Sequence, residues 1–268
     1  MSRFAYLLSP LMRWPATPFV TAIWLVAWSL SATSAAHSQA LAGPSEVVLY
    51  VHSEMKRTDF VERLECALRH VLVAPVSTQN LQLALGRDLL ASPTQLDIQK
   101  VADRFIRATT GDGGSRTFKY LLLPFDLKDA EHHYVFATSF GDQRTSAHVG
   151  ILSTARLDTQ IPNYPDEQNS EQTARRLYKL ILKSVARLAG LKSPDACVLA
   201  FPRNLEELDQ KSTEFCPDDR AALVAAGVIK PQQDVGTGCA LMSRRQTPMD
   251  VARLGLVGVL ALGPTDWR

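Results

Sequence analysis

The sequence lacks the short motifs that identify many enzymes, and no histidine occurs in its last 120 residues. We find no His-Glu-x-x-His zinc motif, no Gly-x-Ser-x-Gly nucleophile elbow and no Gly-x-x-x-x-Gly-Lys phosphate loop. The chain has six histidines, and none follows His148. The sequence therefore carries no direct signature of a zinc peptidase, a serine hydrolase or a P-loop nucleotide-binding protein.

Strong net charge and long hydrophobic runs are also missing. The formal net charge is +2, which leaves no overall basic footprint for nucleic acid. No run of about eighteen or more apolar residues follows residue 40, so we do not expect the body of the protein to span a membrane. What is present, 46% hydrophobic and 21% charged residues, is typical of a globular domain and excludes collagen-like, coiled-coil and disordered classes.

The first 40 residues contain no acidic side chain and have the features of a secretory signal peptide. Arg3 and Arg13 precede an uncharged segment at 15–36, and small residues favour cleavage after Ala36 or Ala40. We predict a signal peptide at 1–40 and a single domain at 41–268, which makes the protein secreted or periplasmic. The uncharged segment is also just long enough for an uncleaved membrane anchor, and a buried core helix is the third alternative.

The mature chain would carry its four cysteines into an oxidising compartment. They are Cys66, Cys197, Cys216 and Cys239. Four cysteines can form up to two disulfides in three connectivities, and spacing alone does not select one.

Apolar residues recur in alternating strand and helix patterns along residues 41–268. Helical spacing predicts helices over residues 58–72, 97–109, 171–189 and 221–226. Short apolar or alternating runs predict strands over residues 46–51, 71–76, 120–124, 134–140 and 148–152, and a polar loop covers 158–170. Strands that alternate with helices predict an α/β fold, with α+β as the alternative.

Histidine offers few metal ligands in this sequence. His132 and His133 alternate on a predicted strand, so their rings would point to opposite faces. One of them, or His148, could bind a metal together with a distant ligand. The alternative is that these histidines are exposed or hydrogen-bonded.

Short segments between residues 119 and 223 follow one another in a recognisable order. They are Pro124-Phe125-Asp126-Leu127, residues 137–141, residues 149–157, a helix opening at 175–179, Gly190-Leu191, residues 197–201, and residues 205–211 followed by Phe215-Cys216. In order and spacing they resemble the archaemetzincin family of zinc metallopeptidases. The resemblance implies a metzincin-like mixed sheet with the long former active-site helix packed against it.

The family's zinc-binding residues are not found at the matching positions. The family carries His-Glu-x-x-His-x-x-Gly-x-x-His-Cys, with three histidines on the catalytic zinc and the glutamate as general base. When the chain is aligned on its Gly190, Lys183, Arg187 and Ser193 stand at the histidines and Ser184 at the glutamate. The resemblance therefore implies a domain with no catalytic residues and no zinc cofactor.

The resemblance also implies a pairing for the cysteines. Four cysteines bind a second zinc in the family, and only Cys197 and Cys216 remain here. Two cysteines that lie close together in an oxidising compartment would form a disulfide. The bridge Cys197–Cys216 is therefore expected, with Cys66 and Cys239 as the complementary pair.

Basic side chains line one side of the helix predicted at 171–189. Arg176, Lys179, Lys183 and Arg187 are spaced three, four and four residues apart, which places them in one stripe. The stripe is either a solvated helix face or a groove that binds an anion or a partner where the substrate cleft would be.

These observations predict a secreted, catalytically inactive archaemetzincin-like domain with a binding or structural role. Its partner would be an unidentified protein or an anionic ligand, not nucleic acid, and a membrane only if the amino-terminal segment is retained. The alternative is an active metal-dependent hydrolase that uses ligands outside the family motif, such as His132, His133 or His148. A third possibility is a membrane-tethered envelope protein.

Overall fold

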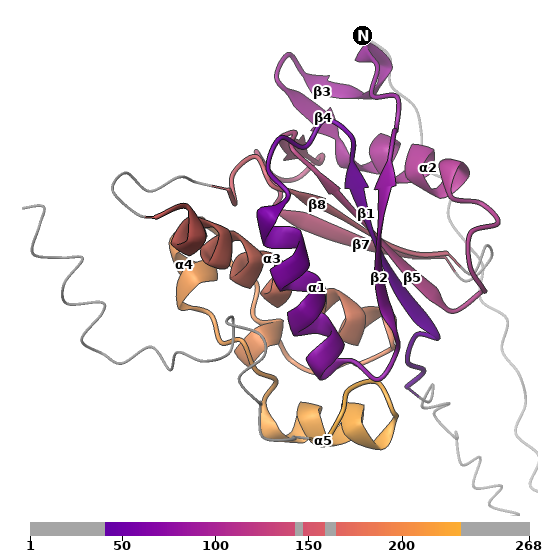
Figure 1. Cartoon of the computed structure of the whole chain (residues 1–268), viewed down its shortest axis with the longest axis vertical. Helices are drawn as coiled ribbons and strands as arrows, with labels where there is room; N and C mark the ends of the chain where they lie inside the picture. Colours follow the sequence, from indigo (N-terminus) through magenta and orange to yellow (C-terminus); the bar gives the residue numbers. More distant parts are fainter. Residues whose placement is uncertain (1–40, 143–146, 159–164, 232–268) are drawn as a thin grey trace, which may run out of the picture. The chain divides into compact units, whose positions relative to one another are not determined.

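A five-stranded mixed sheet forms the centre of the fold (Figure 1). The computed structural model describes residues 41–142, 147–158 and 165–231, all within one compact unit, Gln39–Arg268. The strand order is β2-β1-β5-β8-β7. The strands are β1 (Glu46–His52), β2 (Val76–Leu81), β5 (Thr117–Leu123), β7 (Ala137–Asp142) and β8 (Ala147–Ser153). β7 is antiparallel to β8 and forms one edge of the sheet, and the other neighbours are parallel.

Helices cover both faces of this sheet, because the strands are apolar on both sides. Val47, Leu49 and Val51 of β1 pack in one core with α1 (Asp59–Val71) and α3 (Asp166–Leu188). Val48 and Tyr50 pack in a second core with α2 (Ile98–Ala108). Figure 1 shows α1 and α3 on one side of the sheet and α2 on the other.

Smaller elements complete the fold. A three-stranded sheet has the order β3-β4-β6. Its strands are β3 (Leu90–Ser92), β4 (Gln95–Asp97) and β6 (Leu127–Lys128). The remaining elements are the 3-10 turns η1 (Arg87–Leu89) and η2 (Cys197–Leu199) and the helices α4 (Leu205–Gln210) and α5 (Pro217–Ala225).

The α/β class predicted from the sequence is confirmed, but several element boundaries are wrong. No strand forms at 71–75, because α1 runs to Val71 and β2 begins at Val76. His132 and His133 precede β7 and do not lie on a strand. α3 begins at Asp166, inside the predicted polar loop. Pro165 precedes it, and the acidic side chains of its first turn suit the positive end of a helix dipole.

The segment after α3 returns along the helix. α3 ends at Leu188, and Gly190 shortly after it has a φ of 97°, a conformation that favours glycine. A disulfide joins Cys197 in η2 to Cys216 before α5. This is the pair that the resemblance implies, whereas Cys239 lies outside the described residues together with the predicted signal peptide. Within the described ranges, no helix is long and apolar enough to cross a membrane.

Candidate binding groove

A groove of about 400 Å³ lies between the edge strand β7 and α3. Its lining residues are Ala137, Thr138 and Ser139 of β7, Leu180, Lys183, Ser184 and Arg187 of α3, and residues 132, 134–136 and 201–203 together with Asp129. Residues spaced three or four apart on a helix share a face, and this is why Leu180, Lys183, Ser184 and Arg187 all reach the groove. Three of the four positions that the resemblance assigns to zinc chemistry therefore line one cavity.

Asp195 pairs with both basic side chains that α3 presents to the groove. Lys183 Nζ lies 3.0 Å from Asp195 Oδ2, and Arg187 Nη2 lies 2.6 Å from Asp195 Oδ1. Arg187 also donates to the carbonyl of Leu191, at 2.9 Å. Burial acts to raise the pKa of Asp195, but the hydrogen bonds from Lys183 and Arg187 outweigh it and hold that pKa below its ordinary value. Asp195 is therefore a carboxylate clamped by two cations.

Ser184 takes part in a neutral hydrogen-bond chain. Its hydroxyl donates to the Tyr120 hydroxyl at 3.0 Å and accepts a hydrogen bond from Ser139 of β7. Tyr120 is fully buried, and burial raises the pKa of its phenol far above the ordinary value. The chain links β5, β7 and α3, and it contains no group that would act as a base near neutral pH.

The four-residue basic stripe predicted on α3 is not one exposed surface. Arg176 is 3% exposed and donates to both carboxylate oxygens of Asp209, at 2.7 and 2.6 Å. Lys179 is 2% exposed and donates to the carbonyls of Leu208 and Asp209, at 2.9 and 2.8 Å. Burial lowers the pKa of Lys179 to about 8. These two side chains anchor α4 to α3, so only Lys183 and Arg187 face the groove.

Lys211 adds a further amine whose charge interacts with that of Lys183. This side chain is 9% exposed, and its Nζ has no hydrogen-bond partner among the described residues. Burial, followed by the positive charges of Lys183 and Lys179, lowers the pKa of Lys211 to about 7, although Asp195 acts in the opposite direction. Nothing in the sequence pattern marks this residue.

Aromatic and basic residues form the outer rim of the groove. Phe201 is 58% exposed, with Lys183 Nζ at 5.3 Å and the His132 ring at 6.1 Å from the centre of its ring. Tyr134 donates to the carbonyl of Arg203 at 3.0 Å. An exposed phenylalanine beside a lysine gives the rim both an apolar and a cationic surface.

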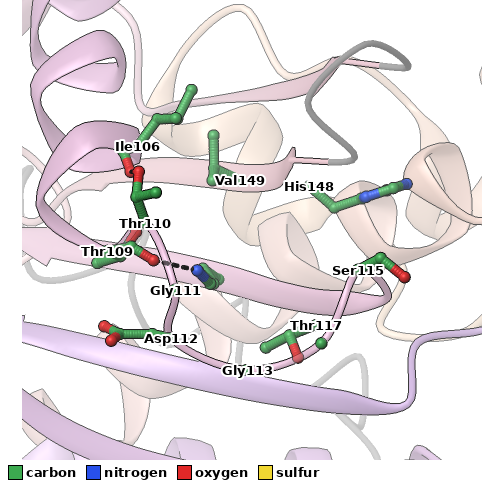
Figure 2. Close-up of a pocket in the computed structure, with 12 residues that line it drawn as sticks. Ile106, Thr109, Thr110, Gly111, Asp112, Gly113, Ser115, Thr117, His148 and Val149 are labelled. Atoms are coloured by element: carbon green, nitrogen blue, oxygen red, sulfur yellow. Dashed lines mark hydrogen bonds between the residues drawn. The ribbon is translucent and has the colours of Figure 1, made fainter.

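The histidines proposed as alternative metal ligands do not come together. His132 lines the groove and pairs with Asp129, with its Nδ1 2.9 Å from a carboxylate oxygen. The carbonyl of His133 accepts from Gln95. His148 stacks on Phe118 and lines a different cavity of about 390 Å³ (Figure 2).

The polar groups of that second cavity serve the fold. Figure 2 shows the glycine-rich loop at 111–114 with Asp112, Ser115 and Thr117 around the cavity. Lys119 donates to the Thr109 carbonyl at 2.5 Å, which caps the carboxyl end of α2. Tyr50 donates to Asp112 at 3.1 Å and ties the loop to β1.

The residues of the α3 groove do not fit a zinc ion. A catalytic zinc needs about three nitrogen, oxygen or sulfur ligands without positive charge. Lys183 and Arg187 are cations here, and each already holds Asp195. Within the part of the chain that the structure describes, no three histidine, cysteine, aspartate or glutamate side chains are placed to hold a metal.

The sequence matches no model of a known protein family and no curated protein at a significant level. Its fold is nevertheless similar to those of solved protein structures. A zinc-dependent peptidase from Methanocorpusculum labreanum shares 24% sequence identity and a TM-score of 0.52, over 66% of this chain and 99% of that one. An archaemetzincin from Methanopyrus kandleri shares 20% identity and a TM-score of 0.51, over 68% and 94% of the two chains. The chain therefore has an archaemetzincin-like fold, and the predicted metzincin-like mixed sheet with its long helix is confirmed.

Proposed function

We propose that this protein is a secreted or periplasmic, catalytically inactive member of the archaemetzincin-like fold, and that its groove binds a partner protein. The observation that carries the proposal is the ion pair of Asp195 with Lys183 and Arg187. This arrangement occupies the helix face from which zinc ligands would have to come. With Ser184 in a neutral hydrogen-bond chain, the groove also has no carboxylate on α3 to act as general base.

A binding role is supported by the shape of the groove. β7 is the edge strand of the sheet, so its outer backbone groups have no neighbouring strand among the described residues. An extended segment can form main-chain hydrogen bonds with such an edge. The exposed ring of Phe201 offers an apolar contact beside it.

Export is supported by two independent features. Residues 1–40 have the composition of a secretory signal peptide. The bridge between Cys197 and Cys216 belongs to a chemistry that persists in oxidising compartments and is rare in the cytosol.

The first test is the zinc content of protein purified without a metal-binding tag, measured together with hydrolysis of casein and of a peptide library. We expect less than about a tenth of an equivalent of zinc per chain and no cleavage above background, because the groove offers cations where ligands are needed. One zinc per chain that survives dialysis, or zinc-dependent cleavage, would contradict the proposal.

A restoring variant provides the matched comparison. Lys183→His, Ser184→Glu, Arg187→His and Ser193→His together reinstate the residue types that the resemblance assigns to these positions. Zinc uptake by this folded variant, but not by the wild type, would show that the geometry is retained and that the residue types alone prevent binding. A folded variant that takes up no zinc would contradict the alignment on which the proposal depends.

A further inference from the structure

Basic side chains outnumber their carboxylate partners on one side of α3. Five basic side chains gather here, and two carboxylates pair with three of them. The basic residues are Arg176, Lys179, Lys183, Arg187 and Lys211, and the acidic residues are Asp195 and Asp209. A third carboxylate of the groove, Asp129, is paired with His132. Both carboxylate oxygens of Asp209 accept hydrogen bonds from Arg176. Asp195 is the carboxylate that pairs with Lys183 and Arg187.

Lys211 shows this excess independently. Its amine is buried, and among the described residues no acceptor lies within hydrogen-bond distance. Unpaired buried amines are costly, and buried charges in proteins are ordinarily paired.

Asp195 indicates which ligand chemistry the two groove cations accept. Its side chain is 45% exposed and comes from the loop that follows α3, not from the helix itself. Lys183 and Arg187 reach the same carboxylate with different nitrogens, at 3.0 and 2.6 Å. The site is thus a two-cation clamp for a carboxylate, closed by a residue of the same chain.

The surroundings of the clamp favour a peptide over a small anion. Phe201 lies beside Lys183 and is 58% exposed, so its ring is accessible to an apolar side chain of a bound peptide. The edge strand β7 runs along the other wall of the groove. A peptide could contact the strand with its backbone, Phe201 with an apolar side chain and the clamp with an acidic one.

We propose that the groove binds an acidic, extended segment of a partner protein, and that a glutamate or aspartate of this segment replaces Asp195 on Lys183 and Arg187. This inference rests on the proposed function, since it names the class of partner for the same groove. Asp195 then acts as an internal competitor that keeps the clamp closed in the free protein.

Fluorescence anisotropy with a defined peptide tests the inference. The probe is a fluorescein-labelled decapeptide of alternating glutamate and valine, and the matched peptide has glutamine in place of glutamate. At physiological salt we expect the glutamate peptide to bind about tenfold more tightly or better. Equal binding of the two peptides, or tighter binding of a ten-nucleotide oligothymidylate than of the glutamate peptide, would overturn the inference.

Variants of the clamp give the sharper test, because they are expected to change affinity in opposite directions. Asp195→Asn keeps the shape but removes the competing charge, so it should tighten binding of the glutamate peptide about fivefold or more. Lys183→Gln should weaken it by a similar factor. Arg107→Gln, an exposed cation on α2 on the other face of the sheet, should change it by less than about twofold. A purely structural role for Asp195 would give weaker or unchanged binding in Asp195→Asn and would overturn the inference.

A rim variant keeps the experiment decisive if changes in the clamp disturb folding. Phe201→Ala removes an exposed ring and should leave the melting temperature unchanged. We expect Phe201→Ala to weaken binding of the glutamate peptide about fivefold. The preference for this peptide over the glutamine peptide should be preserved. Unchanged affinity would overturn the proposed position of the peptide. The mass of each peptide is checked after incubation with zinc, since cleavage would contradict the proposed function and not the preference for acidic segments.

Discussion

Lys211 is buried without a hydrogen-bond acceptor in the part of the chain that the structure describes. Arg176 and Lys179 are also buried, but carboxylate and carbonyl oxygens accept their hydrogen bonds. The sequence placed Arg176 and Lys179 on one helix face with Lys183 and Arg187. It could not show that Arg176 and Lys179 are buried. Their acceptors, Leu208 and Asp209, lie about 30 residues further along the chain. Such partners are set by tertiary packing and leave no trace in helical spacing.

Replacing Lys211 by methionine should stabilise the protein at neutral and mildly acidic pH. Burial lowers the pKa of Lys211 from 10.5 to about 7, so between these values the unfolded chain binds more protons than the folded one. Wild-type stability should therefore rise with pH across this window. We expect Lys211→Met to gain about 1–3 kcal/mol in unfolding free energy at pH 6, and less at pH 10.

Urea unfolding at pH 6, 8 and 10 measures this difference, with Lys56→Met as the control because Lys56 is exposed. An advantage of Lys211→Met that stays constant across pH would show that packing, and not the charge of the amine, is responsible.

At the scale of elements, α3 connects the sheet, the groove and the carboxyl-terminal helices. The sequence located this helix from its apolar spacing but placed its start five residues late, because the polar residues 166–170 look like a loop in isolation. Pro165 and the favourable dipole at Asp166 and Glu167 extend it. The strands β3, β4 and β6 were missed, since two or three residues are too few to show an alternating pattern.

The tie between α3 and α4 is expected to contribute strongly to stability. Arg176 is buried and shares a bidentate ion pair with Asp209. Asp209→Asn leaves the guanidinium without its counter-charge, and we expect a loss of about 2–4 kcal/mol in unfolding free energy. Thermal and urea unfolding measure the loss. Glu206→Gln, on the same short helix and exposed, is the matched control and should cost less than about 0.5 kcal/mol. A similar loss in both variants would argue against a special role for the buried pair.

At the scale of the whole molecule, order and spacing of short segments revealed more than any single residue. The resemblance over residues 119–223 indicated the mixed sheet, the long helix and the pairing of Cys197 with Cys216. It could not indicate Asp195, because this residue lies between the matching segments Gly190-Leu191 and 197–201 and belongs to neither. Phe201 was visible in sequence only as part of an apolar run, and its exposure depends on the fold.

The disulfide should support the carboxyl-terminal part of the described chain. It closes a loop with a sequence separation of 19. By the chain-entropy relation, loss of the bridge should cost about 3 kcal/mol. We expect the double variant Cys197→Ser and Cys216→Ser to unfold at correspondingly lower urea concentration than the wild type. An unchanged midpoint would show that packing of η2 and α5 holds the loop without the bridge.

The disulfide also determines the conditions under which this loop stays closed. A loop closed by a coordinated zinc ion opens when a chelating agent removes the metal. The bond between Cys197 and Cys216 does not depend on a metal ion, and it is broken by reductants instead. This loop therefore stays closed when zinc is withheld and opens under reducing conditions.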